Sequence, residues 1–181
     1  MADQSPVMGT ASPPVDAPVF TIERIYVKDL SLENPNSPKS FLSSEQPQIE
    51  VSLQTRGEPV TEGIFESVLT VTVTAKAADQ TLFLVEVAQA GVFQIRNIPE
   101  TELQPILGIH CPNILFPYAR EAISSAIMHA GYPPINLAPI NFEALYAQQM
   151  QQLVAAQAGQ GAQAPVAGAA AAQSPIIQTA H

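Results

Sequence analysis

The first half of the chain alternates between hydrophobic and polar positions with a period of two residues. Such alternation is typical of strands that bury one face, and it is clearest where threonines separate Leu69, Val71 and Val73. The pattern predicts four strands, at residues 20–32, 48–55, 64–75 and 81–93. Turn-forming residues at 56–59 and 78–80 predict short connections. We therefore expect an antiparallel meander, with the 33–47 loop lying across it.

The second half of the chain changes to helical spacing. Residues 100–109 predict a short helix that Pro105 interrupts, and Asn113 is the expected N-cap of a longer helix that ends at Gly131. Residues 132–140 are rich in proline and predict an extended crossover before a final helix capped by Asn141. The expected apolar faces of the two longer helices are Ile114, Ala119, Ile123, Ala126, Ile127 and Ala130, and then Phe142, Leu145, Tyr146, Met150 and Leu153.

Strands followed by helices predict an α+β fold, a four-stranded antiparallel sheet with helices packed on one face. Two helices cover only one face well, whereas the third and fourth strands carry apolar residues on both faces. We therefore expect the uncovered area to meet another copy of the chain. Residues 1–18 are expected to form a disordered N-terminal arm, residues 19–156 the folded domain, and residues 157–181 a disordered tail rich in alanine and glutamine.

The chain is acidic, with 16 Asp and Glu against 7 Lys and Arg and a formal net charge of −9. This balance argues against binding to nucleic acid or to anionic membrane surfaces, and it favours basic or unfolded cationic partners. The alternative interpretation is a solvated acidic surface. The single cysteine, Cys111, allows no internal disulfide, and neither a signal peptide nor a long apolar run is apparent. We expect a cytoplasmic protein that does not insert into membranes.

The sequence offers little for catalysis. Cys111 with a histidine is the one candidate for a nucleophilic pair, and a structural cysteine before a proline is the alternative. No metal-ligand spacing and no phosphate-binding Gly-Lys-Ser/Thr loop is present. The sequence therefore predicts a protein that is not an enzyme, needs no cofactor and does not use ATP.

Several segments resemble the SecB family of bacterial protein-export chaperones. They lie at residues 24–36, 71–74 and 91–93, and in two unusual runs, CPNILFPYARE at 111–121 and NLAPINF at 136–142. The resemblance extends from residue 19 to about residue 152. It implies a four-stranded antiparallel sheet with helices, assembled as a dimer of dimers into a homotetramer. It also implies a holdase that binds unfolded preproteins without ATP and delivers them to the SecA translocation motor.

The resemblance also suggests where partners bind. A motor-binding acidic patch is implied at Asp29, Glu33 and Glu86, with a generic solvated acidic face as the alternative. For the client-binding groove the alternative is that the same side chains pack a helix onto its own sheet. The expected groove residues are Phe41, Leu42, Leu137, Phe142, Leu145, Tyr146 and Met150.

Some features depart from the family. The N-terminal arm is longer, the tail is not acidic, and Glu45 stands where a relative has tryptophan. Two other functions stay open at this point. One is a SecB-like chaperone dedicated to a single client such as an antitoxin, and the other is a structural oligomer without a client groove.

Overall fold

The computed structural model describes residues 17–78 and 80–160 of the chain, with side chains through residue 155. Among these, the residues up to Tyr146 form one compact unit, and those from Ala147 form a second. The expected N-terminal arm and tail lie almost entirely outside the described residues. Residues 157–160, assigned above to the tail, are instead the last residues of helix α3 (Phe142–Gln160).

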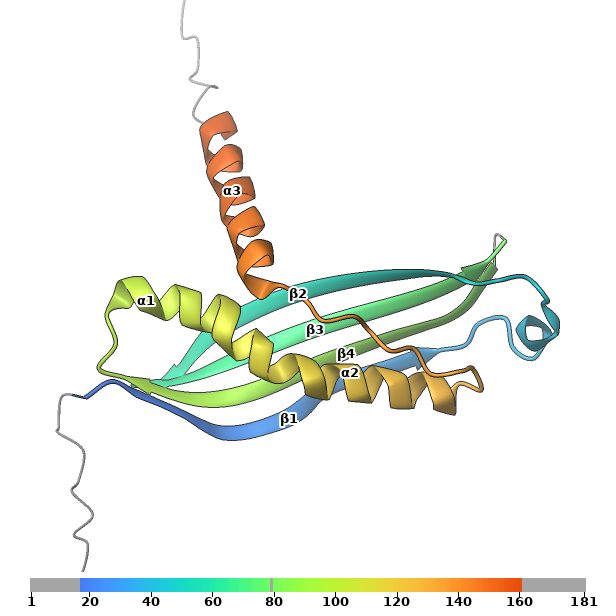
Figure 1. Ribbon diagram of the computed structural model, residues 1–181, viewed down its shortest axis with the longest axis horizontal. Coiled ribbons are helices and arrows are strands. Elements are labelled where there is room, and N and C mark those ends of the chain that lie inside the picture. The colour runs from blue at the N-terminus through green and yellow to red at the C-terminus, as the bar shows by residue number, and fades with distance from the viewer. Residues whose placement is uncertain (1–16, 79, 161–181) are drawn as a thin grey trace, which may run out of the picture. The chain divides into compact units, whose positions relative to one another are not determined.

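Four long antiparallel strands form the sheet: β1 (Val19–Glu33), β2 (Gln48–Thr61), β3 (Ile64–Ala77) and β4 (Gln80–Arg96). Their order is β1-β4-β3-β2 (Figure 1). The expected meander is therefore wrong, because β1 pairs with β4 and not with β2. The 34–47 connection is long enough to carry the chain from one edge of the sheet to the other, whereas the remaining strands follow one another through tight turns. The result is a Greek-key order.

The turn expected at residues 56–59 is also wrong, because β2 continues through it. Gly57 pairs with Ser67 and Pro59 pairs with Phe65. An edge strand tolerates a proline because one row of its N–H groups has no neighbouring strand to bond. The chain turns at Gly63 instead, where φ is +70°. This left-handed conformation is one that glycine adopts at little cost.

One helical run extends from Glu100 to His129, through α1 (Glu100–Pro105), a π-helical turn η2 (Ile106–His110) and α2 (Cys111–His129). The expected N-cap at Asn113 is therefore wrong, since this residue lies inside the run. In the π turn the Cys111 N–H bonds to the carbonyl of Ile106, five residues back. Proline has no N–H to donate to a helix. The wider π turn comes just before Pro112, and the helical run continues through this residue without a break.

The end of α2 was predicted correctly. Gly131 adopts φ +88°. Its N–H bonds to the Met128 carbonyl at 3.0 Å, while the Tyr132 N–H bonds to the Ile127 carbonyl at 3.3 Å. These two bonds form a Schellman motif, which satisfies the last carbonyls of the helix. The cap of α3 is confirmed as well, because Asn141 Oδ1 accepts a hydrogen bond from the Ala144 N–H at 3.0 Å.

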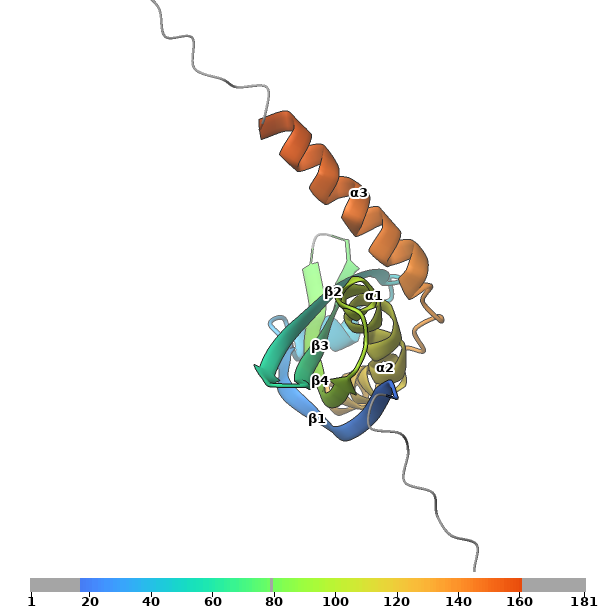
Figure 2. The same ribbon diagram turned by 90° about the vertical axis from the view of Figure 1, so that its left-hand side faces the viewer.

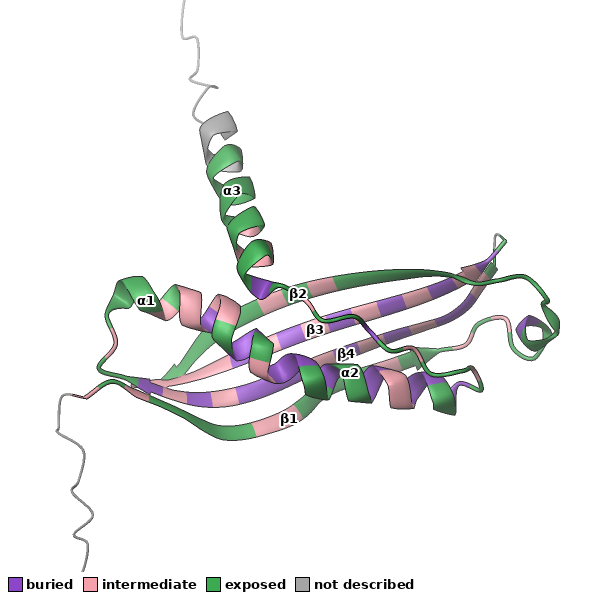
Figure 3. Ribbon diagram, viewed as in Figure 1, coloured by how far each residue is buried: buried purple, intermediate pink, exposed green. Residues whose placement is uncertain are grey.

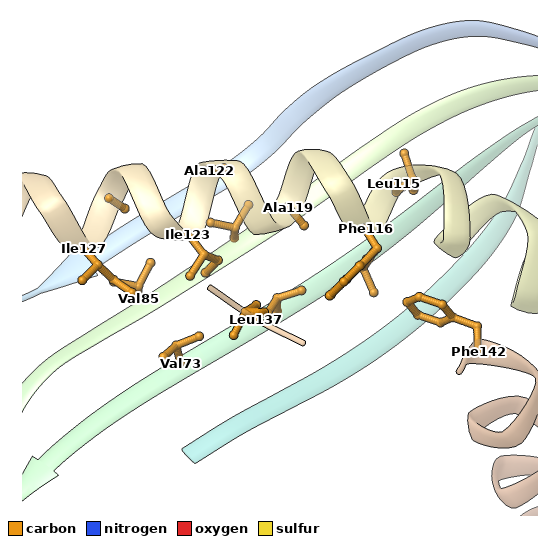
Figure 4. Packing of buried hydrophobic residues seen from close by; sticks show 14 of the residues in the cluster. Val73, Val85, Leu115, Phe116, Ala119, Ala122, Ile123, Ile127, Leu137 and Phe142 are labelled. Carbon is orange, nitrogen blue, oxygen red and sulfur yellow. The ribbon is translucent and has the colours of Figure 1, made fainter. Parts of the chain in front are cut away.

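The core lies between α2 and the two central strands, so the predicted α+β fold with a helix on one face of a four-stranded antiparallel sheet is confirmed (Figure 2). On β3 and β4 every second side chain is buried against the helix (Figure 3). The crossover adds Leu137 at 8% exposed, and α3 adds Phe142 at 1% exposed, beside Phe116 of α2 (Figure 4). The predicted helix side was right, since Ala119, Ile123, Ala126, Ile127 and Ala130 are all buried.

The 34–47 connection does not lie across the sheet as expected but joins its two edges at one end (Figure 1). It contains a short 3-10 turn, η1 (Lys39–Leu42). Two amides hold its first residues. Asn34 Nδ2 donates to the Ala130 carbonyl at 3.0 Å, and Asn36 Nδ2 donates to the Thr81 carbonyl at 2.9 Å. The loop is therefore attached where α2 ends and where β3 turns into β4.

Candidate functional site

An uncovered row of apolar side chains follows strand β2. Helix α2 packs on β3 and β4, so the edge strand stays exposed, as Figure 3 shows along most of β2. Ile49 and Val51 pair with Ala75 and Val73, which are core residues, and so point to the helix-bearing face. They are nevertheless 39% and 42% exposed. These two side chains lie on the core side of the sheet, but no helix covers them.

Two of the predicted groove residues lie in the connection that leads into β2. Phe41 and Leu42 of η1 are 48% and 87% exposed, and β2 follows them in the chain. Toward the other end of β2, Leu107 of the π turn contacts Gly57, where an added Cβ would lie 3.0 Å from Leu107 Cβ. We name this row the apolar strip. It consists of Phe41, Leu42, Ile49, Val51, Leu53, Leu145 and Tyr146.

Tyr146 and Leu145 lie at the far end of the apolar strip, and both are half-buried. The Tyr146 ring rests on Gly108 of the π turn, where a Cβ atom would lie 2.5 Å from the ring's Cδ2. Phe41 lies beside Gly131, where a Cβ atom would be 3.3 Å from its ring. Gly108 lies before the start of α2 and Gly131 after its end, and α2, with 19 residues, is roughly 28 Å long. The predicted groove residues therefore do not form one cluster but are spread along the length of the sheet.

Three predicted groove residues have a different setting. Leu137 and Phe142 are 8% and 1% exposed and belong to the core, so their burial favours the packing alternative for these two. Phe142 meets Phe116 edge to face, with ring centroids 5.9 Å apart. Met150 is 40% exposed and lies in the second unit.

The other edge strand, β1, carries a second apolar surface. Leu30 and Leu32 pair with Val87 and Val85 of the core, so they also point to the helix-bearing face, and they are 46% and 36% exposed. With α2 they line a hollow of about 290 Å³. We name the exposed side chains of this strand the β1 flank, which consists of Phe20, Ile22, Val27, Leu30 and Leu32.

The uncovered apolar area was expected on the second face of the third and fourth strands, and this location is wrong. In the part of the chain that the structure describes, the large hydrophobic side chains that are exposed lie on β1, β2, η1, α2 and α3, and none on β3 or β4. Threonines alternate with the core residues on β3, and neighbouring strands shield both central strands. The helix is narrower than the sheet, so it is the two edges that remain uncovered.

The open face of the sheet gathers the three acidic residues. Glu86 of β4 pairs with Ser31, while Asp29 pairs with Ala88 and Glu33 with Leu84. Paired residues of an antiparallel sheet share a face, and alternate residues of a strand return to it. All three carboxylates therefore lie on the face opposite α2. Thr72 Oγ1 donates a hydrogen bond to Glu86 Oε2 at 2.8 Å, which orients that carboxylate.

A β-bulge in β1 explains why Asp29 and Glu33 face this way. Val27 pairs with Gln89 and Asp29 pairs with Ala88, so Lys28 is an extra residue. Strict alternation from Tyr26 would have turned Asp29 and Glu33 to the helix side. Gln89, which is 2% exposed, donates from Nε2 to the Tyr26 carbonyl at 2.9 Å, beside the bulge. Lys28 and Asp29 consequently line the same hollow, of about 550 Å³, together with Glu86.

Charges elsewhere on the open face are paired. Lys28 Nζ lies 2.5 Å from Glu66 Oε2, and Tyr26 donates a hydrogen bond to Glu66 Oε1. The Lys28 hydrogen bond, followed by that of Tyr26, lowers the pKa of Glu66, while the hydrogen bond to Glu66 raises the pKa of Tyr26. Within the described residues no ion pair joins Asp29, Glu33 or Glu86 to a cation. Asp29, Glu33 and Glu86 thus form an unpaired acidic region on this face, although Lys28 of the charge pair lines the same hollow as two of them.

The candidate nucleophile is buried. Cys111 is 0% exposed, and burial raises the pKa of its thiol to about 12. A thiol with that pKa is protonated at neutral pH, whereas the thiolate is the reactive form. Cys111 therefore serves as a small core side chain.

The described residues contain neither a metal-ligand cluster nor a membrane-spanning helix. No three His, Cys, Asp or Glu side chains among residues 17–78 and 80–160 gather closely enough to hold a metal ion. None of the helices in that part of the chain combines the length and the apolar character needed to cross a membrane.

Several residues of these surfaces carried no sequence signal. Apolar and polar residues alternate around Ile49 and Val51 as they do in a half-buried strand, so the sequence alone does not show that these two side chains are exposed. Their exposure depends on where α2 lies. Gln89 and Thr72 are ordinary polar residues of strands. Their roles rest on contacts with Tyr26 and Glu86, which the pairing of β4 with β1 and β3 creates.

Comparison with known proteins gives consistent matches. The family model for "Preprotein translocase subunit SecB" matches residues 14–153. The protein-export protein SecB of Dechloromonas aromatica is 56% identical over 151 residues, which cover 83% of this chain and 97% of that protein. The proteins of the same name from Chromobacterium violaceum and Azoarcus are 62% and 64% identical, over 75% and 73% of this chain and 90% and 88% of theirs.

A solved structure shares the fold. It is a SecB-like chaperone of Mycobacterium tuberculosis in complex with a ChAD peptide from the HigA1 antitoxin. The TM-score is 0.58 at 15% sequence identity, over 67% of this chain and 90% of that one. At this identity the likeness concerns the fold.

Proposed function

Because this chain belongs to the SecB family of protein-export chaperones, we propose that it is a holdase that binds unfolded preproteins without ATP. It then delivers them to the SecA translocation motor. The observation that carries the proposal is the apolar strip, a set of exposed and half-buried aliphatic and aromatic side chains on an acidic chain. We place this activity in the cytoplasm, where preproteins are still unfolded.

The apolar strip suits clients of many sequences. An unfolded chain exposes short apolar stretches, and burying one large side chain contributes roughly 1.5–3 kcal/mol before ordering costs. Phe41 and Leu42 at one end and Tyr146 at the other provide separate contact points, so that one client meets several of them and gains avidity. The outer edge of β2 has no neighbouring strand and offers main-chain hydrogen bonds to an extended client segment. Of the predicted groove residues, Leu137 and Phe142 support the strip from within the core.

Self-association accounts for the second apolar surface. The β1 flank lies on an edge strand, and exposed side chains such as Leu30 and Leu32 beside α2 are costly to leave in water. A second copy placed along β1 covers them and satisfies the free edge. The family resemblance extends this pairing to a dimer of dimers, a homotetramer. The apolar strip, on the opposite edge, then stays available to clients.

Delivery to the motor is assigned to the unpaired acidic region of the open face. Asp29, Glu33 and Glu86 form no ion pair with a cation of the described residues, and a basic segment of SecA is the complementary partner. This face is separate from the apolar strip. Client and motor therefore bind at the same time, as transfer requires.

A chaperone dedicated to one client is the second candidate, because the structural neighbour was solved with an antitoxin peptide. The identity to that neighbour is 15%, against 56–64% to the export proteins named above. Capture of clients from a lysate separates the two functions, since export predicts many preproteins and a dedicated chaperone predicts one dominant client.

The decisive experiment is to hold a purified unfolded preprotein competent for translocation. The full chain is added to the preprotein with and without ATP, and uptake into SecA-containing membrane vesicles is measured after a delay. We expect competence to persist in both conditions. Loss of competence without ATP, or no protection at all, would refute the holdase. A structural oligomer with no client site would likewise fail to suppress client aggregation in light scattering.

A further inference from the structure

Three aromatic rings run from the core to the surface at the end of the sheet where α2 stops. Phe83 of β4 is 2% exposed, and its ring centroid lies 4.9 Å from that of Tyr132. Tyr132 in turn lies 5.2 Å from Phe41, which is 48% exposed. Tyr132 therefore connects a ring fixed in the core to a ring of the apolar strip.

The hydroxyl of Tyr132 makes a second connection to the same 3-10 turn. It donates to Ser40 Oγ at 2.8 Å, and Ser40 is only 5% exposed although it lies in η1. The amides of Asn34 and Asn36 attach the residues before the turn. Tyr132 thus reaches η1 itself, through its ring on Phe41 and through its hydroxyl on Ser40.

This attachment has a consequence for the neighbouring leucine. Leu42, which follows Ser40 and Phe41 directly in η1, is 87% exposed. Because Tyr132 holds Ser40 and Phe41 in place, the turn keeps the Leu42 side chain pointing into solvent. A binding surface that is ordered in advance avoids part of the entropy cost of ordering side chains when a partner binds.

We propose that Tyr132 is a positioning residue for client binding, which holds η1 so that Phe41 and Leu42 meet unfolded apolar segments. This inference rests on the proposed holdase function and adds to it a residue outside the strip. The backbone of Tyr132 also closes the Schellman motif of α2, but that bond involves the N–H and not the side chain. Side-chain substitutions therefore separate the two roles.

The test uses Tyr132→Phe and the double variant Tyr132→Phe/Ser40→Ala in the full chain. The single change leaves the buried Ser40 hydroxyl without its partner, and we expect the urea midpoint to fall by about 0.5 M. The double change removes both hydroxyls, so we expect the midpoint to recover. Client affinity, in contrast, should be about three- to tenfold weaker in both variants, because both lose the hydroxyl bond to η1 and keep only the ring contact with Phe41.

The client probe is reduced, carbamidomethylated lysozyme, a permanently unfolded basic chain, and its binding is measured by isothermal titration calorimetry. Tyr118→Phe is the matched control, because this tyrosine of α2 is 51% exposed and should change neither quantity. The chain has no tryptophan, so Leu42→Trp provides a single reporter of the order of η1. We expect Tyr132→Phe to lower the fluorescence anisotropy of that reporter.

The outcomes separate the inference from the function beneath it. If the double variant regains full client affinity together with its stability, the Tyr132 hydroxyl is a structural contact only and the inference is overturned. The same conclusion follows if the reporter anisotropy does not change. If the unmodified chain fails to bind the unfolded probe, the proposed holdase function itself is refuted.

Discussion

Replacing Leu42 by serine tests whether the apolar strip binds clients. The side chain is 87% exposed, so its removal takes almost no packing from the folded unit. Surface changes away from special features alter stability by at most about 0.5 kcal/mol. Any loss of client binding by Leu42→Ser therefore reports on the surface and not on the fold.

The size of the loss follows from the burial of one leucine. A client that covers Leu42 gains roughly 1.5–3 kcal/mol, less about 0.5–1.5 kcal/mol for ordering the side chain. The net effect of about 1–2 kcal/mol corresponds to an affinity about five- to thirtyfold weaker. Titration of the unfolded lysozyme probe measures it directly, beside urea unfolding of the same variant.

Two further variants sharpen this experiment. Val60→Ser is the matched control, because Val60 is 62% exposed on β2 but lies outside the apolar strip, and we expect unchanged affinity. Phe142→Ala is the opposite case, since a side chain 1% exposed should cost about 3–5 kcal/mol of stability when truncated. Full affinity in Leu42→Ser, or a stable Phe142→Ala that no longer binds, would refute the division between strip and core.

Three other predictions concern the remaining surfaces. Charge reversal by Glu86→Lys should weaken SecA binding and its dependence on salt, while client affinity stays unchanged. Thr72→Val removes only the hydrogen bond that orients Glu86 and should have a smaller effect in the same direction. SecA affinity that survives Glu86→Lys at low salt would exclude this face as the SecA site. Leu30→Glu, on the β1 flank, should lower the molar mass measured by multi-angle light scattering, whereas an unchanged mass would place self-association elsewhere. Glu66, whose pKa is lowered by Lys28 and Tyr26, should contribute stability that is present above the unfolded carboxyl pKa of about 4.3 and lost as the pH falls through its lower folded value. Urea midpoints should therefore fall less between pH 5 and pH 3 in Glu66→Gln than in the unmodified chain, and equal slopes would contradict the pairing.

Local signals predicted much of the architecture. The alternation of Leu69, Val71 and Val73 with threonines identified β3, and the α+β class followed from strands preceding helices. The helix end at Gly131 and the cap at Asn141 were also correct. These features depend on backbone conformations and side-chain bonds within a few residues, which the sequence displays directly.

Errors arose wherever a neighbour distant in sequence decides the outcome. Residues 56–59 were predicted as a turn because glycine and proline are common in turns. An edge strand such as β2 nevertheless tolerates both residues. Asn113 was predicted as a helix N-cap because no local signal indicates that a π turn precedes Pro112 and that the helix is already formed at this point. The strand order depended on the 34–47 connection, whose length permits either a neighbouring or a crossing path.

The candidate surfaces divide in the same way. The amino-acid pattern alone showed which side chains are apolar or acidic, and its long runs at 111–121 and 136–142 pointed to the family. That Cys111 is not a nucleophile followed only from its burial in the fold. The packing of distant elements made Phe142 a core residue and left Phe41 and Leu42 on the surface, because burial depends on how far α2 extends over the sheet. The acidic face likewise depends on a single bulge at Lys28, since one extra residue in a strand changes the side to which every following side chain points.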